Sequence, residues 1–124
     1  MERGRAENAK GHYEISRTYF DKAIRYLGEC HTAACAPVLN DARGYQGCLL
    51  FTIGEFQAAE PILEKVTRVP ASQMDKSLLI ESLSAYSNIL LGTNREREAV
   101  PYVALRKSLM IAFPNAIPKP PARQ

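Results

Sequence analysis

Long apolar runs are missing from this chain of 124 residues, and no stretch approaches the roughly 20 apolar residues that a membrane-spanning helix needs. The first residues, MERGRAENAKGHYE, also lack the apolar segment of a secretory signal. The seven glycines are scattered and form no phosphate-binding loop of the GxGxxG or GxxxxGK type. We therefore expect no membrane span, no secretory signal and no nucleotide-binding loop.

Cysteine is scarce, with three residues at positions 30, 35 and 48. Because this number is odd and no export signal accompanies it, the sequence predicts no disulfide framework and a reducing, cytoplasmic location. Zinc could be held by the thiolates of Cys30, Cys35 and Cys48 with the imidazole of His31. No C-x2-C pair is present, however, and adjacent residues point in different directions on a helix. We therefore predict no metal site and no other cofactor.

Catalytic constellations are also missing. A Cys–His nucleophile would need an orienting carboxylate, and no motif places one. The carboxylates of Glu55, Glu60 and Glu64, with Lys65 and Arg68 nearby, suit solvated ion pairs along one helix better than a carboxylate dyad. The alternating charges of residues 94–98, NRERE, are typical of a solvated turn. The sequence therefore predicts that the protein is not an enzyme.

A strong excess of charge is missing as well. The formal net charge of +3 comes from the two tails, because residues 11–113 contain eleven basic and eleven acidic side chains. This balance argues against a face that binds polyanions. A nucleic-acid-associated helical-repeat protein remains the alternative, since Arg17, Lys22 and Arg25 could act together with the basic N-terminal arm, residues 1–10.

Helical spacing of apolar residues, by contrast, extends over most of the chain. Apolar side chains recur every three or four positions within residues 13–27, 56–66, 79–90 and 100–110. Turn-forming residues separate these stretches, and Ser72 is placed to cap the helix that follows it. We predict an all-α fold of about six helices in three hairpins. The four prolines of residues 114–124 predict an extended tail.

An internal repeat is the most informative feature of the sequence. At an offset of 36, Gly11, Phe20 and Ala23 coincide with Gly47, Phe56 and Ala59. At a further offset of 40, residues 59–61 (AEP) coincide with residues 99–101 (AVP). Small residues at such positions allow two helices to approach closely. The spacing is typical of a helical solenoid, in which stacked hairpins bury the apolar faces that no hairpin covers alone.

The middle unit resembles the tetratricopeptide repeat through Gly47, Leu50, Gly54, Phe56, Ala59, Leu63 and Val66, with Pro70 close behind. The run GEFQAAEPILEKV, echoed by REREAVPYVALRK, is most similar to the kinesin-light-chain-like type. The resemblance covers residues 5–113 and implies a right-handed α-solenoid of three hairpins, at about 5–36, 37–71 and 72–113. Glu14 and Glu96 depart from the family pattern, so the outer repeats are degenerate. A plain helical bundle is the alternative fold.

The resemblance also implies a function. In this family the first helix of each hairpin lines a concave groove for a peptide or helix, so we predict a non-catalytic adaptor with a protein partner. A small secretion or assembly chaperone built on these repeats, and a homo-oligomer or part of a larger complex, remain open. A clamp for a carboxylate tail is disfavoured, because no matching position carries a fixed positive charge and Glu81 would repel a carboxylate. The implied groove residues are Asn8, His12, Ile15, Ser16, Tyr45, Cys48, Thr52, Ser84, Asn88 and Leu91.

Overall fold

The computed structural model describes residues 2–30 and 32–116, with side chains from Glu14 onward, and this part of the chain contains helices and no strand. The predicted all-α class is therefore confirmed. The predicted extended tail begins instead with a short 3-10 helix, and its residues 117–124 lie outside the described part. The elements are α1 (Glu2–Gly28), α2 (Cys35–Thr52), α3 (Phe56–Thr67), η1 (Ala71–Gln73), α4 (Lys76–Gly92), α5 (Glu96–Ala112) and η2 (Pro114–Ala116).

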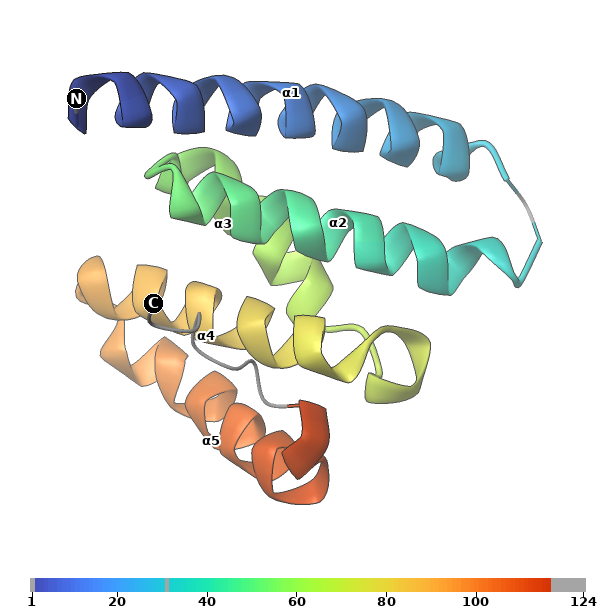
Figure 1. Ribbon diagram of the computed structural model, residues 1–124. Helices are drawn as coiled ribbons and strands as arrows, with labels where there is room; N and C mark the ends of the chain where they lie inside the picture. Colours follow the sequence, from blue (N-terminus) through green and yellow to red (C-terminus); the bar gives the residue numbers. More distant parts are fainter. Residues whose placement is uncertain (1, 31, 117–124) are drawn as a thin grey trace.

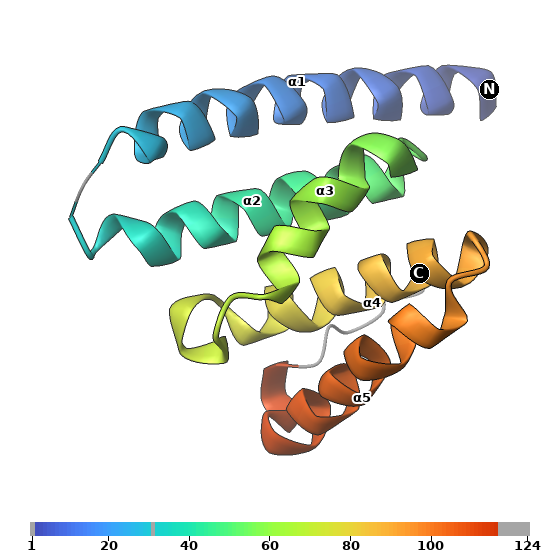
Figure 2. The same cartoon turned by 180° about the vertical axis from the view of Figure 1, so that it is seen from behind.

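The helices form a stack in which each neighbours the next along the chain (Figure 1). The helix α1 lies at one edge and packs chiefly on α2. Two hairpins follow, α2 with α3 and α4 with α5, and they are joined because α4 also contacts both α2 and α3. Figure 2 shows α3 crossing the stack from the end of α2 toward the start of α4.

The two hairpins share one turn geometry, 40 residues apart. Gly54 and Asn94 adopt left-handed backbone conformations, with φ of 84° and 60°. In each turn the following amide donates to a carbonyl at the helix end, from Glu55 to Leu50 at 2.9 Å and from Arg95 to Leu90 at 2.8 Å. This pattern is the Schellman motif, which ends a helix where glycine or asparagine tolerates a positive φ.

The predicted first hairpin does not form, because α1 is one continuous helix of 27 residues. Five α-helices are described where about six were predicted. At the offset of 36, Thr18 occupies the position of Gly54, and a β-branched residue strongly disfavours the left-handed conformation that the turn requires. The Thr18 hydroxyl instead donates to the carbonyl of Glu14 at 3.0 Å. The chain therefore continues as helix through this point.

The core surrounds α4, which is buried over most of its circumference. One cluster gathers α2, α3, α4 and α5 around Leu63 and Leu90, and a second lies near the start of α4 around Leu79 and Leu83. Gly47 makes the α2–α3 contact possible, since a Cβ atom there would lie 2.7 Å from Leu63 Cδ2. The small residues of the repeat therefore mark helix contacts, as the sequence predicts.

The predicted cap of α4 is wrong by three residues. Ser72 lies within η1, and the Asp75 side chain accepts a hydrogen bond from the Leu78 amide at 3.0 Å. Asp75 has an extended backbone, with φ −61° and ψ 130°, as N-cap residues usually do. Its own amide donates to Asp41 Oδ1 on α2 at 2.9 Å, which fixes the start of α4 against α2.

Candidate functional site

One face of α2 and α4 remains uncovered in the described part of the chain. The two helices are parallel neighbours. Gly44 of α2 approaches Leu78 of α4, and Cys48, one turn later on α2, approaches Ser82, one turn later on α4. The side chains of Tyr45, Thr52, Asn88 and Leu91 are all exposed on these helices. We call these four residues the α2–α4 face. These four side chains are apolar or uncharged, and the exposed Glu81 carboxylate lies nearby on α4, on the same side of the helix as Asn88.

The other predicted groove residues are placed differently. Ser84 is half-buried on α4, and Ser16 is half-buried on α1. Ile15 is well exposed, and helical phase places it about 140° around α1 from Phe20, which stacks on Tyr45 of α2. Asn8 and His12 lie in α1, and their side chains fall outside the described residues. The structure therefore leaves four of the ten predicted residues exposed on the neighbouring helices α2 and α4.

Cys48 does not belong to this face. Its side chain is half-buried between α2 and α4, with Sγ 3.6 Å from Ser82 Oγ. Burial raises the pKa of the Cys48 thiol to about 11, and the nearby Glu81 carboxylate acts in the same direction. A thiol with so high a pKa is a poor nucleophile and a poor metal ligand near neutral pH. Cys48 is therefore a packing residue.

The aromatic anchor Tyr45 is part of a larger aromatic row. Its ring stacks on Phe20 of α1, with centroids 5.7 Å apart and an interplanar angle of 12°. Phe20 in turn meets Tyr19 edge-on, also at 5.7 Å. Tyr19 was not among the predicted site residues, although its four-residue spacing from Ile15 could have indicated it. The row extends an aromatic surface from α2 onto α1.

A small hollow lies at the turn end of the two hairpins and adjoins the α2–α4 face through Asn88. It has a volume of about 270 Å³ and is lined mainly by Phe51, Phe56, Ile89 and Thr93 besides Asn88. The rings of Phe51 and Phe56 lie 5.4 Å apart and form one wall. This volume suits one apolar side chain rather than a drug-sized ligand. Sequence reasoning missed the hollow because it considered Phe56 only as a position of the repeat.

A second hollow, of about 440 Å³, lies between α3 and α5 and is charged. Arg95 reaches across from the α4–α5 turn to pair with Glu60 of α3, and Arg68 pairs with Glu64 at 2.8 Å. Arg95 was expected to lie in a solvated turn, so this contact between helices is a correction. Burial raises the pKa of Tyr86 at its edge, with the Glu64 carboxylate adding to the effect. Each acid here has a basic partner, so no free carboxylate dyad is formed.

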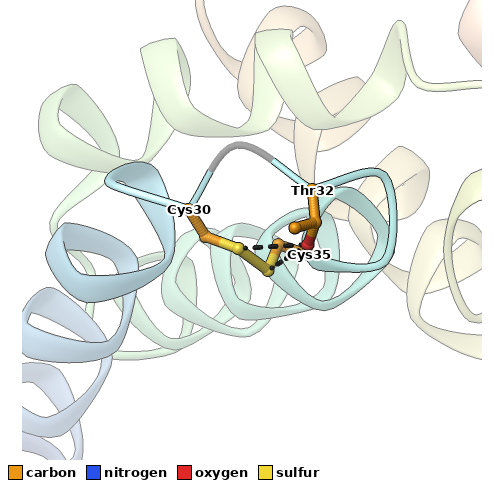
Figure 3. The surroundings of a disulfide bond; sticks show 3 residues. All are labelled: Cys30, Thr32 and Cys35. Carbon is orange, nitrogen blue, oxygen red and sulfur yellow. Dashed lines mark hydrogen bonds between the residues drawn. A yellow bond between two sulfur atoms is a disulfide. The ribbon is translucent and has the colours of Figure 1, made fainter.

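A disulfide joins Cys30 to Cys35 across the connection between α1 and α2 (Figure 3). The prediction of no disulfide is wrong, because the tight reversal between two packed helices holds the two Cα atoms 6.3 Å apart. Thr32 Oγ1 lies 3.3 Å from one sulfur and 3.2 Å from the other. The cytoplasmic location was predicted partly from the expected absence of a disulfide, so this part of its basis is removed. His31 lies outside the described residues.

The described side chains were searched for groups that could ligate a metal ion. Within residues 14–30 and 32–116, no three histidine, cysteine, aspartate or glutamate side chains come close enough to hold a metal ion. Among the described helices, none combines the length and apolar character needed to cross a bilayer.

Comparisons with protein-family models, curated proteins and solved structures found no match to this chain.

The thiols can be counted chemically. In protein prepared without reductant, we expect no rapidly reacting thiol in the native state, one after unfolding, and three after unfolding and reduction. Because the pKa of Cys48 is raised to about 11, its native reaction with an alkylating reagent should rise steeply with pH toward that value. At pH 8 it should be more than about a hundredfold slower than that of an exposed cysteine.

Cys48→Ser is the matched control for this titration. It should remove the single thiol of the unfolded, unreduced protein and leave two after reduction. Three reactive thiols in unfolded, unreduced wild-type protein would contradict the disulfide. Rapid native labelling at pH 8 that disappears in Cys48→Ser would contradict the burial of Cys48.

Proposed function

We propose that this chain is a non-catalytic interaction scaffold that binds a peptide or a helix of another protein on the α2–α4 face. The observation that carries the proposal is the exposure of Tyr45, Thr52, Asn88 and Leu91 on two parallel, neighbouring helices. Their backs pack into the core through Leu50 and Leu90, so the face is supported by rigid elements. Binding residues held on such elements need little ordering when a partner binds.

The chemistry of the face indicates the kind of partner. Tyr45 and Leu91 offer apolar area, and aromatic side chains are frequent anchors of binding energy. Thr52 and Asn88 offer a hydroxyl and an amide for hydrogen bonds to a partner backbone. The hollow beside Asn88 can accept one apolar side chain. We infer a partner segment with spaced apolar anchors, as in an amphipathic helix laid into a groove.

The repeated geometry of the hairpins supports a solenoid of the tetratricopeptide type as the scaffold. The turns at Gly54 and Asn94 have equivalent hydrogen bonds, and the corresponding Ala59 and Ala99 are both fully buried. In this proposal α2–α3 and α4–α5 are two repeat units, and α1 packs on the first of them. In such a stack, each unit buries the face of its neighbour.

The nucleic-acid alternative receives less support from the described contacts. Arg17, one of the three basic residues on α1 that could form a patch, pairs with Glu55 at 2.8 Å. Lys22 and Arg25 stand near Asp21 and Glu29 on the same helix. The local charge is therefore close to balanced, and phosphate binding would need a surplus of positive charge.

A charge placed on the face tests the proposal. The substitution Leu91→Arg puts a guanidinium among the apolar anchors, so proteins captured by the immobilised chain should fall by more than about tenfold. Val100→Arg makes the same kind of change at an exposed position on α5 and should leave capture unchanged. The measurement is quantitative mass spectrometry of the proteins retained by wild type and by each variant.

Thermal unfolding of the two variants provides the control for folding. Both positions are exposed, so both variants should unfold within a few degrees of the wild type. Equal capture by Leu91→Arg and wild type, at equal stability, would contradict the role of this face. Loss of capture in both variants would show that general surface charge, rather than the face, governs retention.

A further inference from the structure

The Cys30–Cys35 disulfide lies at the surface, in the connection between α1 and α2. Both cysteine side chains are half-buried, and Thr32, Ala33 and Ala34 of the same connection are exposed. Exposed disulfides exchange with thiols in solution, whereas disulfides enclosed in a core resist reduction. A small thiol can therefore reach these sulfur atoms while the protein remains folded.

The helix α1 is held to the rest of the protein by contacts that are only partly shielded from water. It packs chiefly on α2. Of its described side chains, in residues 14–28, none is buried, whereas α4 is buried over most of its circumference. Its contacts with other helices include the stacking of Phe20 on Tyr45 and the ion pair of Arg17 with Glu55, whose side chains are 35 % and 41 % exposed. An element with few buried contacts separates from its neighbours at a small cost in free energy.

We propose that the Cys30–Cys35 disulfide is a reducible tether that keeps α1 on α2, and that reduction by a dithiol favours the separation of α1. The bond joins the chain just after α1 to the first residue of α2, so it limits how far the helices can part at that end. Without the bond, the connection regains conformational freedom, and this freedom favours the separated state.

Separation of α1 has a defined consequence on α2. It removes the Phe20 ring from the face of Tyr45 on which it stacks, so this face of the Tyr45 ring becomes open to solvent or to a partner. The tether acts on the packing of α1, and the inference therefore does not depend on the proposed function.

The reduction is a balanced thiol–disulfide exchange. One thiolate of the dithiol attacks the sulfur of Cys30 or Cys35, the S–S bond breaks, and the other cysteine leaves as a thiolate. The second thiolate of the dithiol then displaces the bound cysteine from the mixed disulfide. Two electrons and two protons pass to the protein, and the dithiol is oxidised to a cyclic disulfide. Thr32 Oγ1, 3.3 Å and 3.2 Å from the two sulfurs, can donate a hydrogen bond to the departing thiolate (Figure 3).

Amide hydrogen exchange of the full chain, with and without dithiothreitol, tests the tether. Reduction of the wild type should speed exchange in residues 14–28 by about tenfold or more, because a helix that loses its packing partner frays. Exchange in α4 should stay unchanged, since its core contacts lie away from α1. Cys48→Ser should respond to dithiothreitol as the wild type does, because Cys48 takes no part in the disulfide.

The double variant Cys30→Ser/Cys35→Ser should show fast exchange in residues 14–28 whether or not dithiothreitol is present. The wild type is measured in both redox states, so the test stands even where this variant folds poorly. Reoxidation of the wild type with glutathione disulfide, a small disulfide, should restore slow exchange.

Three results would each overturn the proposal. The first is a disulfide that dithiothreitol reduces only after the protein is unfolded in urea. The second is equal exchange of residues 14–28 in oxidised and reduced wild-type protein. The third is equal acceleration in α1 and α4, which would show that reduction lowers the stability of the whole fold rather than releasing α1.

Discussion

Replacing Leu63 with alanine is expected to lower the free energy of unfolding by about 3 kcal/mol, because Leu63 is fully buried where α2, α3 and α4 meet. The truncated side chain removes apolar contacts and leaves a cavity that the packed helices only partly fill. Urea unfolding followed by circular dichroism measures the change. An unaltered dependence on urea concentration would show that the unfolded state is unaffected.

The matched control for Leu63 is Leu105, whose side chain on α5 is 41 % exposed. Leu105→Ala makes the same chemical change and should cost less than about 1 kcal/mol, because little apolar area returns to water. Equal losses in the two variants would contradict the position of Leu63 at the centre of the core. Such a result would place the α2–α3 contact elsewhere.

Gly47→Val is expected to destabilise the protein by about 3 kcal/mol through overpacking. A Cβ atom at Gly47 would lie 2.7 Å from Leu63 Cδ2 and 2.9 Å from Leu63 Cγ, and the Leu63 side chain is fully buried in the core. The added side chain must therefore push α2 and α3 apart. Gly92→Val is the control, since nothing lies within 4 Å of a Cβ atom there, and its effect should stay within about 0.5 kcal/mol.

The two core predictions are linked by the contact between Gly47 and Leu63. In the Leu63→Ala background, the valine at position 47 occupies space that the leucine has vacated. The cost of Gly47→Val should therefore fall by more than about 1 kcal/mol, which is a coupling typical of residues in direct contact. Additive losses in the double variant would show that the two residues do not touch.

Much of the fold follows from local features of the sequence. The apolar spacing at three and four residues predicts helices because a helix gathers such positions on one side. Gly54 and Asn94 end α2 and α4 because they tolerate a positive φ, and the two later hairpins accordingly fall where the repeat predicts them. Thr18, at the position equivalent to Gly54, does not tolerate a positive φ, so the local sequence predicts no turn there and α1 continues. The repeat alignment by itself predicts a turn at that position.

The candidate site was only partly predictable. Helical phase alone indicates that Tyr45 and Thr52 share one side of a helix, as do Asn88 and Leu91, and all four are exposed. Helical phase cannot show which residue of a neighbouring helix will cover a side chain. Cys48 belongs to the same side of α2, but Ser82 of α4 meets it and α4 buries it. In the same way, a neighbouring helix supplies the contact of Tyr45, whose ring stacks on Phe20 of α1.

The sequence by itself determined the helical class, the period of the repeat and the turns at Gly54 and Asn94, because each depends on residues within a few positions of one another. Only the tertiary structure decided that Cys30 bonds to Cys35, that Arg95 reaches Glu60, and that Tyr19 and Tyr26 of α1 stay exposed. These features depend on how separate helices approach in space. Each of these contacts depends on two groups at once, and local sequence patterns do not show which groups will meet.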